Sequence, residues 1–444
     1  MSPESSIVGE PAARAAPQDA ADDYTRTALA RASMGRGVAD HGAGQIDMTA
    51  LRTYRLARLQ AELRRHGAPA ILLADPINIR YATGMRNMQP WSMHSNLRLA
   101  FVPAEGRAVL FEYAGSEHLA AGLETVAEVR PATSRFWAGT PGTADLAGDR
   151  KVRVWAAEIA DLLRAHGGAD PHLAIDRHVD HFSARTLEAA GIMLLPGQLM
   201  LRDAQAIKSA EEIACMSAAV AVAEAGMHRL RQALEPGRTE IELWSILERT
   251  NVEMGGEYMD TRLLSSGART NPWYQEASDR IVRPGDLVAL DTDMIGPFGY
   301  DADVSRTFFC GPGRPADAQR RLYALAWEQL QHNLALVRPG ASFREMSERA
   351  YTLPEEFHAR QFSMIWHGVG LCGQWPTIVG RGFFATHGEA GTVMPGMTLC
   401  CESYVGAEGG IEGVKLEQQL VVTESGYELL TTFPFEEVLL GREI

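Results

Sequence analysis

The sequence predicts a two-part molecule, an α/β domain followed by a larger α+β domain. The 444 residues suffice for two domains at ~100–200 residues each. In the first half, strand-like and helical segments alternate, which is typical of an α/β domain. In the second half, helices are followed by strand-like segments between Gly and Pro turns, which is typical of an α+β domain. We therefore predict an arm at residues 1–48, a first domain at 49–203 and a second at 204–444.

Composition and charge narrow the class of protein. A hydrophobic content of 46% and a charged content of 22% are ordinary for a globular protein. The formal net charge of −14 repels phosphate backbones and anionic lipid, so neither nucleic acid nor a membrane surface is an expected partner. The N-terminus lacks the basic start and apolar stretch of a signal peptide. The five cysteines include no CxxC pair, which favours reduced thiols. We expect a cytoplasmic protein.

The first domain opens with a helix at residues 48–66, where Leu56, Leu59 and Leu63 recur at helical spacing. The arm before it, rich in Ala, Pro, Gly, Asp and Ser, lacks apolar periodicity and is expected to be partly ordered. The rest of the domain follows as alternating segments. We predict strands at residues 70–74, 99–102, 108–111 and 173–176 and a helix at 152–166.

The second domain begins with a long helix at residues 209–234, favoured by Glu211 and Glu212 in its first turn. Pro236 and Gly237 end it. The later elements are shorter. We predict helices at residues 240–254 and 316–337 and strands at 286–293, 305–310, 397–405 and 418–422.

An acidic pair follows one of these strands. Asp291 and Asp293 come directly after the apolar run 287–290, and along a strand they would project from the same face. Asp303, on the next apolar segment, can return to the same place. Carboxylates at a buried position are costly unless a positive charge lies between them. A cation site is therefore favoured over exposed turn aspartates.

Two glutamates and a histidine add to this set. Glu402 and Glu417 interrupt apolar strand patterns, and His367 lies in the glycine-flanked stretch WHGVG. Either glutamate alone would be typical of the solvent face of a strand. Together, five carboxylates and one imidazole can coordinate two divalent ions, and this donor set favours manganese, iron, cobalt or zinc. We predict two transition-metal ions, with iron, manganese or zinc the leading identities.

The order Asp, Asp, His, Glu, Glu, with HGVG at 367–370 and KLE at 415–417, resembles the creatinase/aminopeptidase P superfamily. The resemblance covers residues ~50–440 and implies a pita-bread catalytic domain behind a creatinase-like N-terminal domain. Within the superfamily, the sequence is most similar to bacterial dimethylsulfoniopropionate lyases. The matching stretches are NIRYAT at 78–83, NMQPW at 87–91 with His94, GGE at 255–257, TRLL at 261–264, RTNPW at 269–273, GVGLC at 368–372 and TTFPF at 431–435.

The resemblance assigns a role to each metal ligand. Asp291 and Asp293 would hold one ion, His367 and Glu402 the other, and Asp303 and Glu417 would bridge the two. The substrate contacts would come from Trp91, His94, Phe362 and Trp375. An aromatic face such as that of Trp91 attracts a sulfonium or ammonium cation.

The sequence also departs from its relatives. The lyases place a catalytic aspartate six residues after the metal histidine, and here that position is Gly373. The pocket tyrosine of the lyases is Phe362, and neither Gly373 nor Gln374 supplies the catalytic histidine of the peptidases. The base could be a hydroxide held by the metals, or one of the side chains Asp301, Glu257, Tyr274 and Tyr300. We predict Tyr300 and Asp301 as the catalytic residues.

Three functions follow, in order of preference. The first is metal-assisted β-elimination of a small zwitterion, an onium carboxylate. The alternative is a metal-dependent C–N hydrolase, similar to Xaa-Pro aminopeptidases or ectoine hydrolases, in which a bridging hydroxide attacks. The third is an inactive scaffold, which six costly ligands argue against. We also expect a homodimer in which the N-terminal domain of one chain covers the pocket of the other.

Overall fold

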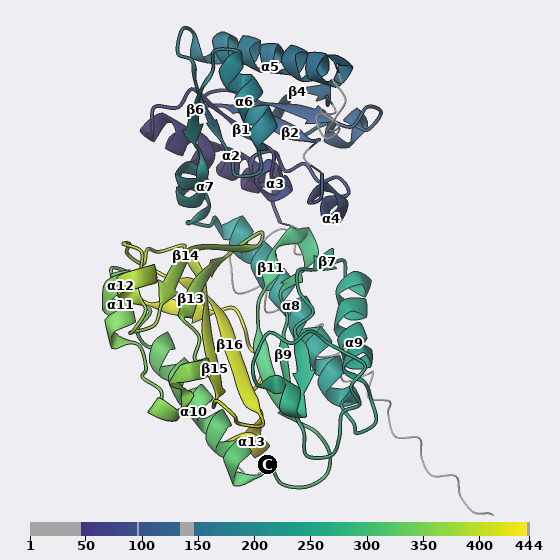
Figure 1. Cartoon of the computed structure of the whole chain (residues 1–444), viewed down its shortest axis with the longest axis vertical. Coiled ribbons are helices and arrows are strands. Elements are labelled where there is room, and N and C mark those ends of the chain that lie inside the picture. The colour runs from purple at the N-terminus through teal and green to yellow at the C-terminus, as the bar shows by residue number, and fades with distance from the viewer. Residues whose placement is uncertain (1–45, 96, 134–145, 442–444) are drawn as a thin grey trace, which may run out of the picture.

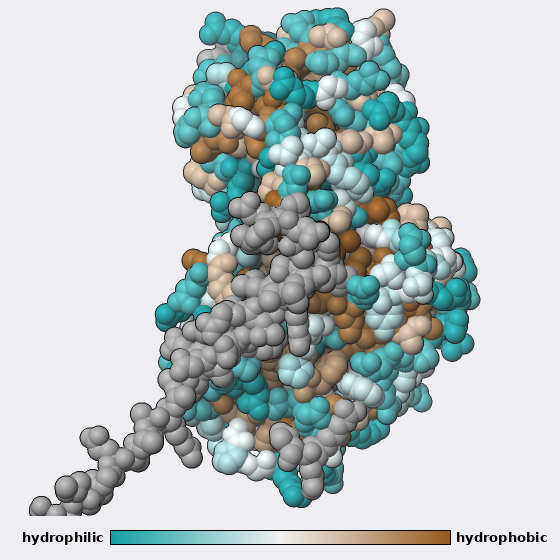
Figure 2. Space-filling model, turned by 180° about the vertical axis from the view of Figure 1, so that it is seen from behind, coloured by the Kyte–Doolittle hydropathy of each residue, from teal (hydrophilic) through white to brown (hydrophobic). Residues whose placement is uncertain are grey.

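The computed structural model describes residues 46–95, 97–133 and 146–441, with side chains described from residue 150 in the last range. The predicted arm lies almost wholly outside the described residues. Figure 1 shows two lobes, the first ending with α7 and the second beginning with α8. From behind, hydrophilic residues dominate the uncovered surface and apolar residues form smaller patches (Figure 2). Among the described residues, no helix has the length and apolar character needed to cross a bilayer.

The N-terminal lobe is a six-stranded sheet with helices on both faces. The strand order is β4-β3-β2-β1-β5-β6, with β1–β2 and β2–β3 antiparallel and the other three pairs parallel. Its strands are β1 Ala70–Leu73, β2 Leu99–Pro103, β3 Ala108–Glu112, β4 Val126–Pro131, β5 His172–Ile175 and β6 Met193–Pro196. Its helices are α2 Met48–Arg65, α3 Pro76–Thr83, α4 Gln89–Ser92, η1 Glu117–Ala120, α5 Leu146–Gly167, α6 His181–Ala189 and α7 Gln198–Gln205.

The alternation of side chains along β1 explains why helices cover both faces of the sheet. Ile71 and Leu73 join the core that contains Leu59 of α2, whereas Leu72 joins the core that contains Trp155 of α5. Since successive strand residues face opposite sides of a sheet, an all-apolar strand requires cover on both faces. The predicted first-lobe helices and strands are therefore confirmed.

The second lobe consists of antiparallel sheets between helices. Its helices are α8 Ala210–Ala233, α9 Glu240–Glu253, η2 Gly267–Thr270, η3 Pro297–Gly299, α10 Asp317–Leu334, α11 Phe343–Arg349, η4 Glu355–Arg360, α12 Phe384–His387 and α13 Glu437–Leu440. Its strands are β7 Tyr258–Met259, β8 Leu264–Ser266, β9 Leu287–Asp291, β10 Met294–Ile295, β11 Asp301–Ala302, β12 Ser305–Phe309, β13 Met364–Val369, β14 Gly373–Val379, β15 Thr398–Gly406, β16 Gly413–Val422 and β17 Tyr427–Leu429.

Three sheets of this lobe meet at the site. Their orders are β11-β10-β7, β12-β9-β8 and β14-β13-β15-β16-β17. Helix α10 packs on β15 and β16, and α8 and α9 lie on the opposite side (Figure 1). Strands β12 and β16 are joined through side chains: Thr307 Oγ1 donates to the carbonyl of Lys415 at 2.9 Å, and Arg306 donates to the carbonyl of Glu417 at 2.7 Å. These bonds hold β9 and β12 against β16, and the predicted α+β architecture is confirmed.

One step of the strand prediction is wrong. Strand β9 ends at Asp291, and Asp293 has φ +35°, in the left-handed region. Asp293 therefore reaches the cavity from a turn and not from the pleat of an extended strand.

Candidate metal centre and active-site cavity

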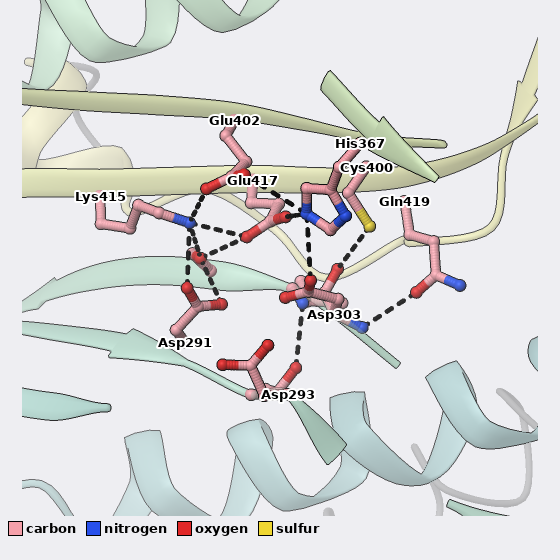
Figure 3. Close-up of polar contacts among 12 residues, drawn as sticks. Asp291, Asp293, Asp303, His367, Cys400, Glu402, Lys415, Glu417 and Gln419 are labelled. Atoms are coloured by element: carbon pink, nitrogen blue, oxygen red, sulfur yellow. Dashed lines mark hydrogen bonds and ion pairs between the residues drawn. The ribbon is translucent and has the colours of Figure 1, made fainter. Parts of the chain in front are cut away.

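The candidate ligands come from strands that meet at one point. Asp291 ends β9, Asp303 lies between β11 and β12, and His367 is on β13. Glu402 of β15 is directly paired with Glu417 of β16. Cross-strand partners lie about 4.5–5.5 Å apart, so this register puts both glutamates beside each other. Figure 3 shows their side chains converging with His367, Asp303 and Asp291.

The distances around His367 fit a divalent ion. Its Nε2 lies 3.3 Å from Asp303 Oδ2, 3.3 Å from Glu402 Oε1 and 3.4 Å from Glu417 Oε1. Charge-assisted hydrogen bonds are shorter, about 2.7–2.9 Å, whereas ligands ~2.0–2.2 Å from a shared ion lie roughly 3.0–3.5 Å apart. Three buried oxygens here also lack a hydrogen-bond donor: Asp303 Oδ1, Glu402 Oε1 and Glu417 Oε1. The donor set fits a metal.

A lysine that was not among the predicted site residues lies in the same cluster. Lys415 Nζ is 3.0 Å from Asp291 Oδ2, 2.9 Å from Glu402 Oε2 and 2.8 Å from Glu417 Oε2. It also donates to Ser305 Oγ at 2.8 Å. The ammonium group is completely buried and compensates part of the carboxylate charge. Residues 415 and 417 share one face of β16, and that period of two was the signal for it in the sequence.

Burial and charge divide the carboxyl groups into two classes. Burial raises the pKa of Asp291 and Asp303, and burial together with the charge of Asp291 raises the pKa of Asp293 to about 7. Burial also acts on Glu402 and Glu417, but the Lys415 charge and the contact with His367 together outweigh it and lower their pKa values. Without a further cation, the aspartates hold protons that a divalent ion would displace.

The cluster lies at one end of a cavity of about 1010 Å³ between the two lobes. The first lobe contributes Asp75, Asn78 and Arg177 to its lining. Five predicted ligands line it: Asp291, Asp293, Asp303, His367 and Glu402. Glu417 is 1% exposed and lies behind this surface. The cavity is therefore lined by metal-fitting side chains of the second lobe and by polar side chains of the first.

One wall of the cavity is aromatic. It includes Trp273, Tyr274, Phe362 and Trp375. The rings of Tyr274 and Phe362 stack with centroids 5.4 Å apart and planes 10° from parallel. Phe362 stacks in turn on Tyr404 at 5.5 Å. The predicted positions of Phe362 and Trp375 thus lie at the cavity, although Arg202 already covers the Trp375 ring at 4.7 Å.

Comparisons with known proteins agree with this geometry. Residues 214–424 match the metallopeptidase family M24, and residues 55–200 match the creatinase/prolidase N-terminal domain. The dimethylsulfoniopropionate lyase DddP of Roseovarius nubinhibens is 37% identical over 404 residues, 89% of each chain. The protein of the same name from Roseobacter denitrificans is 35% identical, again over 89% of each chain. The chain belongs to metallopeptidase family M24.

More distant M24 proteins resemble the chain over shorter spans. An Xaa-Pro dipeptidase of Pyrococcus furiosus is 26% identical over 52% of this chain and 65% of its own length. The solved Xaa-Pro dipeptidase from Bacillus anthracis superposes with a TM-score of 0.69 at 21% identity, covering 87% of this chain and 99% of that one. This second likeness shows the fold alone. The named relatives are enzymes, and this M24 protein is an enzyme with a divalent-metal site of the family's kind.

Tyr300, one of the two predicted catalytic residues, does not line the cavity. Its hydroxyl donates to Glu212 at 2.9 Å and accepts from Arg55 at 3.4 Å, and it is 1% exposed. Burial, followed by the charge of Glu212, raises its pKa well above the ordinary value. It faces α8 and not the cavity. Glu257 is also unsuitable as a base, because Arg80 binds both of its oxygens and Arg86 lies 3.0 Å away.

Asp301 and Gly373 lie together on the cavity wall. Asp301 lines the cavity with an Oδ1 that has no hydrogen-bond donor, and its backbone N–H donates to the Gly370 carbonyl at 2.8 Å. At Gly373 an added Cβ would meet no atom within 4 Å. Asp260, which the sequence analysis did not single out, lines the same cavity. This M24 cavity therefore has carboxylates near position 373 but not at it.

Trp91 and His94 lie apart from the cavity of their own chain, whose lining includes neither. Trp91 is on α4 in the first lobe, 52% exposed, with its ring 5.4 Å from that of Tyr113. Within one chain of this M24 protein, the predicted substrate contacts Trp91 and His94 therefore do not line the cavity.

Proposed function

We propose that the protein is a lyase that cleaves a small onium carboxylate, of the dimethylsulfoniopropionate type, by metal-assisted β-elimination. The observation that carries the proposal is the 37% identity, over 89% of both chains, to a protein named for that activity. The cavity supports it, because a metal-fitting cluster and an aromatic wall can receive the two ends of such a zwitterion.

The cluster fits two divalent transition-metal ions, among which iron, manganese and zinc suit a site with a histidine. Bound there, they would withdraw electrons from the substrate carboxylate and so acidify the neighbouring C–H. Asp291, Asp293, His367 and Glu402 would hold the ions from opposite sides, with Asp303 and Glu417 between them. Metal analysis of protein purified without chelator should give about two ions per chain. Asp303→Ala should lose both, and full metal content in that variant would contradict the bridging role.

We assign the proton acceptor to Asp301. Its carboxylate would take the proton from the carbon next to the substrate carboxylate. The electrons of that C–H bond form the C=C bond, and the C–S electron pair leaves with dimethyl sulfide. A positioned base contributes ~10²–10⁴-fold to a rate. Asp301→Asn should therefore lose at least ~10²-fold in kcat with its metal content intact, whereas loss of the metal would make Asp301 a ligand instead.

A C–N hydrolase remains the second candidate, and Gly373 is the observation that favours it. A glycine there leaves the cavity wider and less negative than a carboxylate would, which suits a bulkier and less cationic substrate. Purified protein should be assayed for dimethyl sulfide release beside hydrolysis of an X-Pro dipeptide and of ectoine. Dimethyl sulfide release alone supports the lyase. Hydrolysis without dimethyl sulfide release overturns it.

We also propose that the enzyme is a cytoplasmic homodimer, in which Trp91 and His94 of one subunit cover the cavity of the other. The support is their exposure on the first lobe, outside the cavity of their own chain. Light scattering tests the dimer, and a monomer with full activity would contradict it.

A further inference from the structure

The backbone of Tyr274 is held in an unusual conformation at the cavity. Its φ is +72°, a value that bulky side chains rarely adopt. Among the described residues the other non-glycine positions of positive φ are Met88, Asp293 and Phe298. Of these four, Tyr274 and Asp293 line the cavity. Strained backbone that persists is typical of functional sites, where the surroundings determine it.

The Tyr274 ring is exposed to solvent but is held in place by a stacking contact. Its side chain is at the cavity and the residue is 70% exposed, while one ring face is stacked almost parallel on Phe362. Phe362 rests on Tyr404, and the Lys415 ammonium lies 5.7 Å from the Phe362 centroid. Tyr274 is thus the outermost ring of a three-ring column, and the middle ring, Phe362, lies beside the ammonium group that pairs with three of the candidate metal ligands.

The cavity that this ring lines is rich in carboxylates. Burial, followed by the charge of Glu402, raises the pKa of Tyr274, and the charge of Lys415 opposes that rise. Glu276 and Asp260 line the same cavity. An aromatic face attracts a cation through its quadrupole, and neighbouring carboxylates add to that attraction.

We propose that the outer face of Tyr274 binds the onium group of the substrate and makes Tyr274 the residue that selects a cationic over a neutral substrate tail. This inference rests on the proposed function for the identity of the substrate. The carboxylate of the substrate then lies at the metal-ligand cluster, and the onium group lies against Tyr274 in the same chain. The left-handed backbone keeps the ring on Phe362, with its second face toward the ligand.

The test compares two ligands of the same shape that differ in charge. The cationic ligand, named for its tail, is 4-(trimethylammonio)butanoate, which cannot undergo β-elimination because its trimethylammonium group is on the γ carbon. The neutral ligand, which has the same carboxylate but an uncharged tail of the same shape, is 5,5-dimethylhexanoate. Titration calorimetry on the metal-containing protein should show at least 10-fold tighter binding of the cationic ligand. Tyr274→Phe should keep this ratio, whereas Tyr274→Leu and Tyr274→Gly should reduce it below 3-fold with unchanged metal content.

Phe298 provides the matched control. It has φ +63° and is 40% exposed, yet it does not line the cavity. Glycine accepts this backbone conformation freely, so Phe298→Gly and Tyr274→Gly should both keep or raise the Tm, while only Tyr274→Gly loses the preference for the cation. Equal binding of both ligands by the native protein, or an unchanged ratio in Tyr274→Leu, would overturn the proposal.

Dimethyl sulfide release separates this inference from the proposed function. If the native protein releases none but Tyr274→Leu loses the preference for the cation, the lyase proposal fails and the onium site stands. If the native protein releases dimethyl sulfide and Tyr274→Leu keeps both the binding ratio and the KM, the lyase stands and the Tyr274 site fails.

Discussion

At the residue scale, position 373 has room for a side chain that it lacks. An added Cβ at Gly373 meets no atom within 4 Å, so Gly373→Asp should fold with a Tm close to that of the native protein. If the enzyme is a lyase, a carboxylate here adds a second proton acceptor to the cavity. We expect the rate of dimethyl sulfide release to rise by about 10-fold or more, toward the ~10²-fold of a positioned base.

Gly373→Asn is the control for this variant, because it has the same size and cannot accept a proton at neutral pH. Equal rates in the two variants would show that volume, and not basicity, is what changed. A large gain in Gly373→Asp alone would show that the native enzyme is limited by its proton acceptor.

The acidic cluster makes stability depend on pH and metal. Between about pH 4 and pH 7 the unfolded chain releases protons that Asp291, Asp293 and Asp303 keep when folded, because burial raises their pKa values, that of Asp293 to about 7. His367 acts in the same direction: its carboxylate neighbours outweigh burial and raise its pKa, so its stabilisation is lost as pH rises. The metal-free protein should therefore have a lower Tm at pH 7.5 than at pH 5.

Bound metal should reverse this trend, because it displaces those protons and binds better as pH rises. Thermal unfolding with chelator and with added zinc tests both directions. Asp293→Asn removes one titrating group, so its metal-free Tm should change less between the two pH values. A metal-free Tm that rises from pH 5 to pH 7.5 would contradict the raised pKa values.

The carboxylates and the histidine of the cluster could be predicted from sequence because charged residues stand out in apolar strands. Lys415 could not be recognised in the same way, since a lysine on a strand is usually at the solvent face. The direction in which the Tyr300 side chain points could not be predicted for a related reason. Tyr300 and Asp301 are consecutive in extended backbone, so one faces α8 and the other the cavity, and the sequence alone does not say which.

At the element scale, Glu212 joins the start of α8 to this backbone. Its Oε2 accepts from the N–H of Ser209 at 3.0 Å in a capping box, and its Oε1 accepts from Tyr300 at 2.9 Å. Tyr300→Phe removes the hydrogen bonds to Glu212 and from Arg55 and should lower the free energy of unfolding by ~1–3 kcal/mol. Because the hydroxyl lies away from the cavity, kcat and KM should stay within about twofold of the native values, in contrast to Asp301→Asn. A large loss of kcat in Tyr300→Phe would support the predicted catalytic role of Tyr300.

The helices were predictable because their ends carry local signals. Ser209 and Thr239 each form a capping box with the glutamate three residues later, and both helices begin where this pattern predicts. The strands β7, β10 and β11 have two residues each and offer no period to detect. They form a sheet only because the chain between β9 and β12 folds back against α8 and pairs with β7, a consequence of tertiary structure.

At the scale of the whole molecule, a buried ion pair fixes one lobe on the other. Arg80 of α3 donates to both oxygens of Glu257, at 2.8 and 2.7 Å, and to the Phe298 carbonyl at 2.8 Å. Arg80→Met would leave the buried Glu257 charge with Arg86 as its one remaining ion-pair partner among the described residues. This should cost ~3–5 kcal/mol of unfolding free energy. Arg86, 55% exposed, is the matched control, and Arg86→Met should cost no more than ~1 kcal/mol. Urea unfolding measures both, and equal costs would contradict this role for Arg80.

The cavity is formed by both lobes, and its lining could not be predicted from the sequence. Asp75 and Arg177 come from the first lobe and Trp375 from the second, and no pattern in the sequence indicates which surfaces of two domains face each other. The same limit applies to Trp91, whose distance from the cavity of its own chain became visible only in the structure. Its predicted contact with substrate therefore requires the proposed dimer.

A mixed dimer tests that dependence. Trp91→Ala alone should lower kcat/KM by about 10-fold if a cation–π contact is lost, and Asp303→Ala alone should be inactive. In a mixed dimer of the two variants, the subunit with intact ligands would receive Trp91 from its partner. Co-expressed and separated through two affinity tags, the mixed dimer should recover about half of the native activity. If Trp91 acted within its own chain, no site in the mixed dimer would be complete, and activity would stay at or below that of Trp91→Ala.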